Sequence, residues 1–200
     1  MLQKPDDSGF RRGFKTWCEN VSLQHRKDLG LSQTDPIDLW NLAKKQGVIV
    51  WKANEVPGID KDTLYVLTKE DPESWSALTL MEHGKRLIIL NPASVPSRMN
   101  SDLAHELSHL IIGHDGTRID ITPDNLLMLH NYGKQHESEA TWLAGCLLLP
   151  RSALLHIRRI SMSIEETCRI YGISKDMLLF RINVTGVDRQ LRSKERTIKK

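Results

Sequence analysis

The sequence His105-Glu106-Leu107-Ser108-His109 places two imidazoles and a carboxylate at a spacing that favours metal binding. Residues four apart lie on one face of an α-helix, so His105 and His109 can bind the same ion without backbone strain. Glu106 is turned by about 100° around the helix axis, which suits a base beside the metal better than a ligand. Zinc lowers the pKa of a bound water toward about 7, so Glu106 is positioned to take its proton in a hydrolytic reaction.

A catalytic zinc also requires a third protein ligand and an open position for water. His114 follows His109 by five residues and comes directly after Gly113, so it is expected to lie off the metal face, as a capping or exposed residue. Glu137 and Glu139 are the stronger candidates. A chance match by surface residues is the alternative, and an apolar stripe on the same segment argues against it. The residues of this stripe are Leu103, Leu107, Leu110 and Ile111.

Glu137 is the favoured third ligand, because the residues on its face are small enough for close helix packing. The residues three, seven and eleven positions after it are Ala140, Ala144 and Leu148. The face of Glu139 carries the bulkier Trp142, Leu143 and Cys146. These side chains would hold the two helices further apart, so Glu139 is expected to support the site without binding the metal, or to lie in solvent.

The surrounding segments predict an α+β fold. Short β-prone runs separated by turn signals indicate a small antiparallel sheet, with strands at 48–51, 63–67, 76–80 and 85–90. Helices are expected at 35–47, from Asn100 or Ser101 to Gly113, after Thr122, at 136–149, and after Ser163 and Ser174. The strand at 87–90 is expected either at a sheet edge, where an extended peptide can add to it, or in the centre of the core.

The residues from His105 to His109, together with the segment from Glu137 to Pro150, resemble the ImmA/IrrE-type metallopeptidases. The likeness extends from about Pro36 to Val187. In that family the first glutamate of the second motif, here Glu137, binds zinc. The resemblance implies a zincin-like fold of the gluzincin type, with a small antiparallel sheet packed on an active-site helix and a helical C-terminal part.

The same resemblance implies a function and a partner. Members of the family are zinc-dependent endopeptidases of the bacterial cytoplasm, often encoded by phages and mobile elements, that cleave or inactivate helix-turn-helix repressors. Such a transcriptional repressor is therefore the expected protein substrate. The predicted domain organisation is an N-terminal helical extension at 1–34, a zinc metallopeptidase domain at 35–187, and a flexible basic tail at 188–200.

Composition argues against several other classes. The 200 residues are 40% hydrophobic and 26% charged, which is typical of one globular domain. A net charge of +3, with the only dense cluster of basic residues near the C-terminus, does not indicate nucleic-acid binding. Three cysteines without a Cys-x-x-Cys pair indicate neither a disulfide framework nor a thiolate zinc site. The polar N-terminus and the short apolar runs favour a cytoplasmic protein without an export signal or a membrane span.

Two rival functions remain open. The chain can be a metal-stabilised regulatory or antitoxin-like module that sequesters a partner without cutting it. It can also be a DNA-binding regulator, because Gly172-Ile173-Ser174 lies between two short helices. The segment after Ser174 is too apolar to present polar side chains to a major groove, so no direct contact with nucleic acid is expected. The sequence does not predict an oligomeric state.

Overall fold

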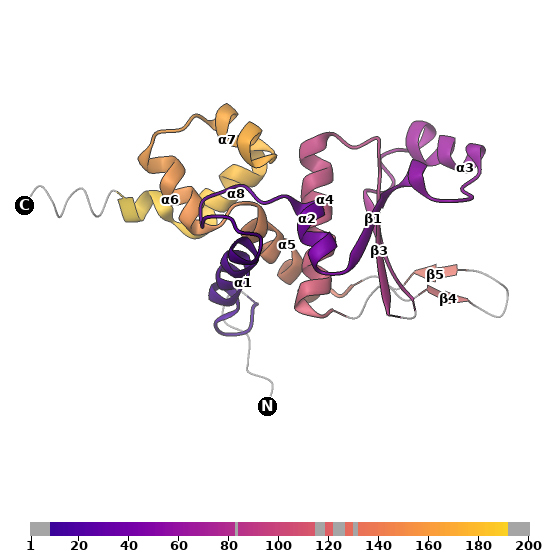
Figure 1. Cartoon of the computed structure of the whole chain (residues 1–200), viewed down its shortest axis with the longest axis horizontal. Coiled ribbons are helices and arrows are strands. Elements are labelled where there is room, and N and C mark those ends of the chain that lie inside the picture. The colour runs from indigo at the N-terminus through magenta and orange to yellow at the C-terminus, as the bar shows by residue number, and fades with distance from the viewer. Residues whose placement is uncertain (1–8, 83, 115–118, 122–126, 130–131, 192–200) are drawn as a thin grey trace, which may run out of the picture.

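The computed structural model describes residues 9–82, 84–114, 119–121, 127–129 and 132–191. The predicted α+β class is confirmed, with a small sheet and a larger share of helix (Figure 1). The elements in chain order are α1 (Phe14–Asp28), α2 (Leu39–Lys45), β1 (Val48–Lys52), the 3-10 turn η1 (Ala53–Glu55), α3 (Lys61–Tyr65), the π-helical turn η2 (Val66–Glu70), β2 (Ala77–Glu82), β3 (Lys85–Leu90), α4 (Pro96–Ile112), β4 (Ile119–Ile121), β5 (Leu127–Leu129), α5 (Lys134–Leu148), α6 (Arg151–Arg159), α7 (Ile164–Tyr171) and α8 (Lys175–Thr185).

The three-stranded sheet is mixed, with strand order β1-β3-β2. β3 is antiparallel to β2, with Leu80 opposite Leu87, and parallel to β1, with Val50 beside Ile88. The predicted all-antiparallel sheet is therefore wrong. The connection from β1 passes through η1, α3, η2 and β2 before β3, and this crossover allows β3 to return in the same direction as β1. β3 is the central strand, so β1 and β2 form the two edges among the described strands of this sheet.

The predicted strand at 63–67 is also wrong, because this segment is helical. The side chain of Asp60 accepts hydrogen bonds from the backbone N–H groups of Asp62 and Thr63, which is an N-cap for α3. Tyr65 at the end of α3 and Val66 at the start of η2 stay exposed. Local capping therefore outweighs the β propensity of 63–67, since no packed sheet face supports these side chains.

Two predicted helix starts differ from the observed ones. α2 begins at Leu39, because Asp38 rather than Asp35 caps it by accepting from the N–H groups of Trp40 and Asn41. α4 begins at Pro96, about one turn before the predicted caps, because proline at the first helical position needs no backbone donor. The predicted end at Gly113 is confirmed, as are the caps by Ser163 and Ser174. Of the helix predicted after Thr122, residues 122–126 lie outside the described residues, and 127–129 form β5.

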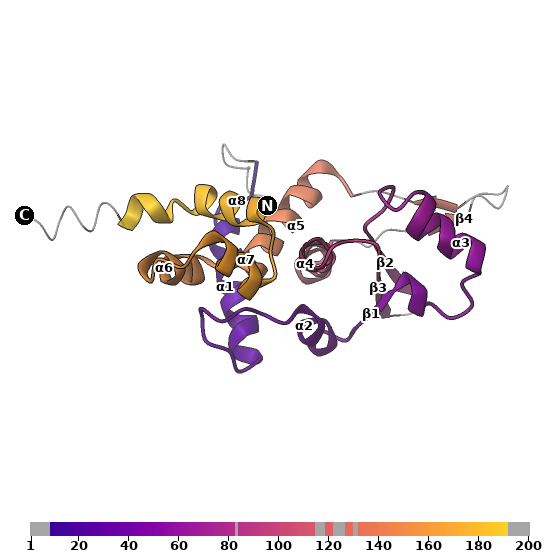
Figure 2. The same cartoon turned by 90° about the horizontal axis from the view of Figure 1, so that it is seen from above.

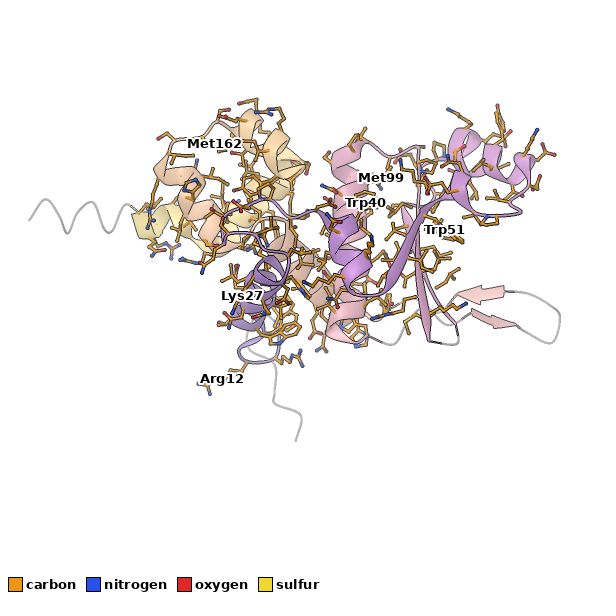
Figure 3. All side chains as sticks on the ribbon, in the orientation of Figure 1. Arg12, Lys27, Trp40, Trp51, Met99 and Met162 are labelled. Carbon is orange, nitrogen blue, oxygen red and sulfur yellow. The ribbon has the colours of Figure 1, made fainter. Side chains whose placement is uncertain are left out.

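Helix α4 lies between the sheet and α5, as the two perpendicular views show (Figures 1 and 2). The helices α1, α6, α7 and α8 gather on the other side of α5, away from the sheet. Figure 3 shows Trp40 on α2 and Trp51 on β1, so these two aromatic residues belong to separate elements. The arrangement leaves α4 with one face toward the sheet and another toward α5.

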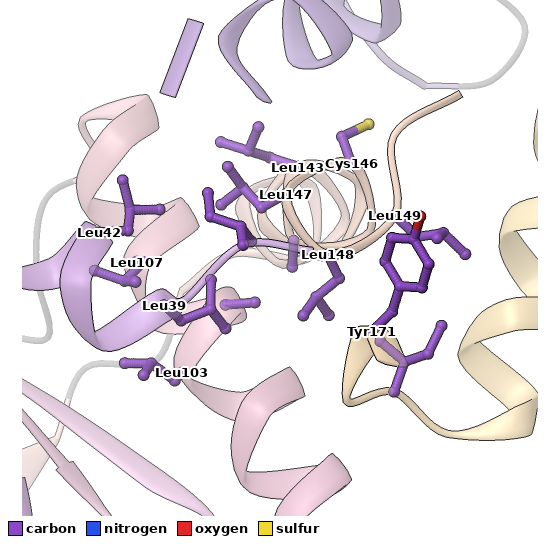
Figure 4. Close-up of a cluster of buried hydrophobic side chains, with 14 of the residues drawn as sticks. Leu39, Leu42, Leu103, Leu107, Leu143, Cys146, Leu147, Leu148, Leu149 and Tyr171 are labelled. Atoms are coloured by element: carbon purple, nitrogen blue, oxygen red, sulfur yellow. The ribbon is translucent and has the colours of Figure 1, made fainter. Parts of the chain in front are cut away.

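Leucines from α2, α4 and α5 form the centre of the core (Figure 4). Leu39, Leu107 and Leu147 are almost completely buried and represent these three helices. The N-terminal residues Phe14 and Cys18 on α1 belong to the same buried cluster. Because each large core side chain contributes about 1.5–3 kcal/mol on burial, this cluster holds α4 and α5 against each other. The packing thereby determines which of their polar side chains meet.

Two buried arginines hold the C-terminal end of α5. Arg26 donates to the carbonyl oxygen of Leu147 at 2.8 Å, and Arg181 donates to that of Leu149 at 3.0 Å. Arg181 also pairs with Glu19 at 2.6 Å. Burial lowers the pKa of Arg26 to about 10, which leaves it charged at neutral pH. These bonds satisfy carbonyl groups that a helix end otherwise leaves without partners, so α5 ends in a fixed position.

The chain after α8 continues for a short helical stretch at 187–191. Val187 is buried there, and Asp188 pairs with Arg158 of α6 at 2.6 Å. The proposed basic tail at 188–200 therefore starts in this helical stretch, and residues 192–200 lie outside the described residues. No single described helix is long and apolar enough to cross a membrane, whereas α5 and α6, bent by 44°, meet the length and composition criteria as a pair.

Candidate metal centre

Helix α4 presents the two histidines of the motif on one side. Leu103, Ala104 and Leu107 bury the opposite side against the core, and this packing sets the rotation of the helix. His109 is fully buried at 0% exposure, whereas His105 is partly exposed. The Nε2 atoms of His105 and His109 lie 3.0 Å apart. The spacing of four residues thus brings the two imidazoles together, as the helical periodicity predicts.

Glu137 reaches the histidines from the first turn of α5. Its Oε2 atom lies 3.1 Å from Nε2 of His105, and its Oε1 atom lies 3.7 Å from Nε2 of His109. The three residues form a group whose ligand atoms all lie within 4.8 Å of one another. The small residue Ala140 is completely buried one turn further along α5, which allows the close approach of the two helices.

The distances between the three donor groups suit a single metal ion. Zinc binds nitrogen and oxygen ligands at about 2.0–2.2 Å, so two ligands in a tetrahedral site are separated by about 3.3–3.6 Å. The observed separations of 3.0, 3.1 and 3.7 Å bracket this range. Two imidazoles and one carboxylate are also a donor set that zinc accepts, with a fourth position left for another ligand. The residues present therefore fit a zinc ion.

Burial keeps the His109 imidazole neutral and able to bind a metal. Burial, followed by the neighbouring His105, His114 and His136, lowers the pKa of His109 to about 3. A neutral imidazole retains a lone pair on one ring nitrogen, whereas a protonated one does not. His109 can therefore act as a ligand throughout the neutral pH range.

Glu106 lies beside the three potential ligands and is held by the sheet. The hydroxyl of Thr79, on the edge strand β2, donates to Oε2 of Glu106. Burial raises the pKa of the Glu106 carboxyl, and the hydrogen bond from Thr79 partly opposes this shift. A carboxyl with a raised pKa exchanges protons more readily near neutral pH, which suits an acid–base role.

A cavity of about 820 Å³ opens at these residues. His105, Glu106, His109 and Glu137 line one part of it. Another part is apolar, with side chains from η1, the following loop, η2 and the sheet. These apolar lining residues include Val56, Ile59, Leu67, Leu78 and Ile89. Polar groups that converge at one end of a largely apolar cavity are typical of a site that binds and converts a ligand.

The comparison with protein families agrees with this geometry. Residues 64–183 match the model of the Peptidase_M78 family, described as the IrrE N-terminal-like domain. This range covers more than half of the chain and includes the histidines, Glu106 and Glu137. The chain belongs to this family. As a member of a metallopeptidase family it is expected to hold a metal, which the convergence of His105, His109 and Glu137 supports.

The solved structures show the same fold in a longer protein. A Mycobacterium tuberculosis transcriptional regulator matches the chain with a TM-score of 0.50 and 14% sequence identity. The match covers 84% of this chain and 46% of the regulator, so this member of the IrrE N-terminal-like family spans less than half the length of that protein. No curated protein sequence matches the chain.

His114 and Glu139 near the site are both more buried than one of the sequence-based alternatives predicted. His114 is 7% exposed rather than solvated, because the left-handed Gly113 (φ 84°) ends α4 and turns the chain back toward His109. Its Nδ1 atom lies 2.9 Å from Nδ1 of His109. Glu139 is 5% exposed and contacts His114, so it supports the site without belonging to the group of three ligands, and the solvated alternative is wrong.

Thr79 is the residue near the site that sequence reasoning missed. A threonine in a β-prone run is common, so its type carries no signal. Its contact with Glu106 depends on the packing of β2 against α4, which joins residues 27 positions apart. The Gly-His pair after α4 is the signal that would have drawn attention to His114, because a left-handed glycine allows the next residue to fold back over the last turn.

Proposed function

We propose that this chain is a zinc-dependent endopeptidase of the gluzincin type, with His105, His109 and Glu137 as metal ligands and Glu106 as general base. The observation that carries the proposal is the convergence of three ligand atoms within 4.8 Å at the wall of a large cavity. When bound, zinc polarises a carbonyl group and lowers the pKa of water toward about 7. Membership in a metallopeptidase family supports the same reaction class.

Glu106 is suited to accept and return the proton. Its Oε2 atom accepts the hydroxyl hydrogen of Thr79, so Oε1 is the oxygen on which the incoming proton is held. The raised pKa of the carboxyl makes Glu106 a stronger base than an ordinary glutamate, so it takes up the proton more readily and holds it for transfer to the amine leaving group. Thr79 also fixes the side-chain rotamer of Glu106. The role of Thr79 is therefore to position the base.

The edge strand β2 is the proposed binding site for the peptide substrate. Ser76, Ala77, Leu78 and Thr79 line the cavity, and β2 is paired on one side with β3. Its other edge has no strand beside it in the part of the chain that the structure describes. An extended peptide can add to such an edge through main-chain hydrogen bonds, without a requirement for sequence. The apolar cavity wall then favours a large apolar side chain near the cleaved bond.

A helix-turn-helix transcriptional repressor is the proposed substrate. The resemblance of the two motifs to the ImmA/IrrE-type peptidases supports it. A domain of this fold also occurs in a transcriptional regulator, which links the fold with control of transcription. The predicted cytoplasmic location fits such a partner, and we place the reaction there.

A metal-stabilised regulatory module that sequesters its partner without cutting it is the second candidate function. The matched transcriptional regulator favours it, because 46% of that protein has this fold. In this alternative the metal ligands stabilise the fold and Glu106 has no chemical role. The two functions therefore differ in their dependence on Glu106.

A cleavage assay with purified repressors separates the two functions. The zinc-loaded full chain is incubated with a panel of helix-turn-helix repressors, followed by mass spectrometry and by binding of each repressor to its operator DNA. We expect at least one repressor to be cut and to lose DNA binding, and we expect Glu106→Gln to do neither. If Glu106→Gln inactivates the repressor as well as the unmodified chain does, sequestration is the function. If no repressor is cut or inactivated, the proposed substrate class is wrong.

A further inference from the structure

Behind the His109 ring lies a line of buried polar groups that the proposed chemistry does not use. Nδ1 of His109 lies 2.9 Å from Nδ1 of His114, and Nε2 of His114 lies 3.1 Å from Oε2 of Glu139. The three side chains are closed to solvent, at 0%, 7% and 5% exposure. Buried polar groups without hydrogen bonds destabilise a fold by about 1–3 kcal/mol each. The contacts in this line are therefore expected to be hydrogen bonds with defined donors.

The direction of each bond follows from the chemistry of the groups. An imidazole that binds a metal through Nε2 carries its proton on Nδ1. Nδ1 of His109 is then a donor, so the facing Nδ1 of His114 must be the acceptor. The proton of His114 is consequently on Nε2, where it donates to the carboxylate of Glu139. A carboxylate only accepts hydrogen bonds. Glu139 therefore determines which nitrogen of His114 donates, and through it which nitrogen of His109 donates.

The neighbouring groups hold these side chains in place. The ring of Tyr132 stacks on that of His109 with centroids 3.7 Å apart, and the ring of His136 stacks on that of His114 at 4.2 Å. Gln135 donates to the second carboxylate oxygen of Glu139 at 3.2 Å. Stacking opposes rotation of the rings out of the line, and Gln135 fixes the carboxylate. The arrangement is thus determined before any ligand binds.

The geometry points to Glu139 and His114 as positioning residues for the metal centre, which act through two imidazoles in series. Glu139 selects the tautomer of His114, and His114 selects the tautomer of His109 that leaves its Nε2 lone pair free to bind zinc. Partners of this kind usually contact a metal-binding histidine directly, and their loss lowers metal affinity by about 10–100-fold. Here the carboxylate acts through an additional ring. This inference rests on the proposed metal site but does not require that the chain cut a peptide.

The tautomers can be read directly by NMR. In the full chain labelled with ¹⁵N-histidine, long-range ¹H–¹⁵N correlations distinguish protonated from bare ring nitrogens. Signals are assigned with His109→Gln and His114→Gln. We expect the metal-free chain to show His109 protonated on Nδ1 and His114 protonated on Nε2. A metal-free spectrum with either proton on the opposite nitrogen overturns the inference, even if the chain has no peptidase activity.

Zinc affinity tests the effect of the line on the metal site. Glu139→Ala should bind zinc about 10–100-fold more weakly in a competition titration with a chromophoric chelator. Glu139→Gln keeps an acceptor oxygen without the charge, so it should restore the His114 tautomer and most of the affinity. The matched control is Glu165→Ala, which removes an exposed carboxylate on α7. Equal zinc affinity of folded Glu139→Ala and the control overturns the inference, as does a failure of Glu139→Gln to restore the tautomer.

Discussion

At the N-terminal end of α5, Glu137 and Glu139 meet three histidines, whereas at its C-terminal end the carbonyl oxygens of Leu147 and Leu149 meet two buried arginines. Both ends contain buried polar groups that lie far apart in the sequence. At the C-terminal end, arginine donors satisfy the carbonyl oxygens and fix the end of the helix. At the N-terminal end three potential ligand atoms lie within 4.8 Å of one another at the wall of a cavity. The N-terminal end of α5 thus has the features of a binding site, whereas the contacts at its C-terminal end stabilise the fold.

This difference arises from the neighbours of each end. The N-terminal end of α5 lies beside α4 near the sheet, where the cavity keeps one side open. The C-terminal end is surrounded by α1, α6 and α8, and side chains from α1 and α8 donate to its carbonyl oxygens. Glu19 of α1 closes this region further, because it bonds both the Arg181 side chain and the backbone N–H of Arg151. We therefore expect substitutions at the two ends to affect different measurable properties.

The largest expected effect is on the chemistry at the N-terminal side. Glu106→Gln should lower peptide hydrolysis by about 10²–10⁴-fold, because the amide cannot accept a proton as the carboxylate does. Zinc content and thermal stability should stay near those of the unmodified chain. Cleavage of a peptide library followed by mass spectrometry measures the rate, and metal analysis serves as the control. Retention of full activity would show that Glu106 is not the base.

Substitution at the C-terminal side should produce the largest loss of stability. Arg181→Met leaves the Leu149 carbonyl without its donor and Glu19 without its ion pair, and removal of one partner of a buried pair destabilises by about 3–5 kcal/mol. Urea denaturation measures this change. Zinc bound per folded chain should not change. If Arg181→Met instead lowered zinc affinity without affecting stability, the proposed separation between the two ends of α5 would be wrong.

Loss of the third ligand should affect metal binding more than folding. Glu137→Ala should weaken zinc binding more than Glu139→Ala does, because it removes a direct ligand and leaves only the two histidines. The matched control is Ser138→Ala, which alters the next residue on an exposed position of the same helix turn. Calorimetric titration with zinc compares the two variants. Equal affinities would remove Glu137 from the ligand set.

The free energy of unfolding of the metal-free protein should depend on pH in a way that reflects the buried His109. Because the pKa of His109 falls to about 3 in the folded state, the unfolded chain binds more protons at this residue between pH 6.5 and about 3. His109 therefore contributes a loss of stability as the pH falls through this window, by up to about 1.4 kcal/mol per pH unit. In urea denaturation at a series of pH values, His109→Gln should lose less free energy of unfolding per pH unit than the unmodified chain. Identical slopes would contradict the assignment of a neutral, buried imidazole.

Sequence reasoning reached the parts of this molecule that depend on local spacing. Residues four apart on a helix must lie on one side of it, so the approach of His105 and His109 followed from the helix alone. The position of Glu137 could be predicted from the small side chains on its face. Both inferences use the periodicity of a single helix, which tertiary packing rarely changes.

Most of the parts that sequence reasoning missed depend on contacts between distant elements, and one depends on a local helix cap that outweighed β propensity. The direction of β1 relative to β3 is set by a crossover, and the helical state of 63–67 is set by the cap at Asp60. The contact of Thr79 with Glu106 requires the sheet to pack on α4. The burial of His114 requires the left-handed turn at Gly113 to lie against α5. None of these features has a periodic pattern in the sequence.

An anomalous difference map at the zinc edge, from crystals of the zinc-loaded full chain, tests the central claim most directly. We predict one strong peak between Nε2 of His105, Nε2 of His109 and the carboxylate of Glu137. A peak between His114 and Glu139, or no peak at the three proposed ligands, would contradict the account.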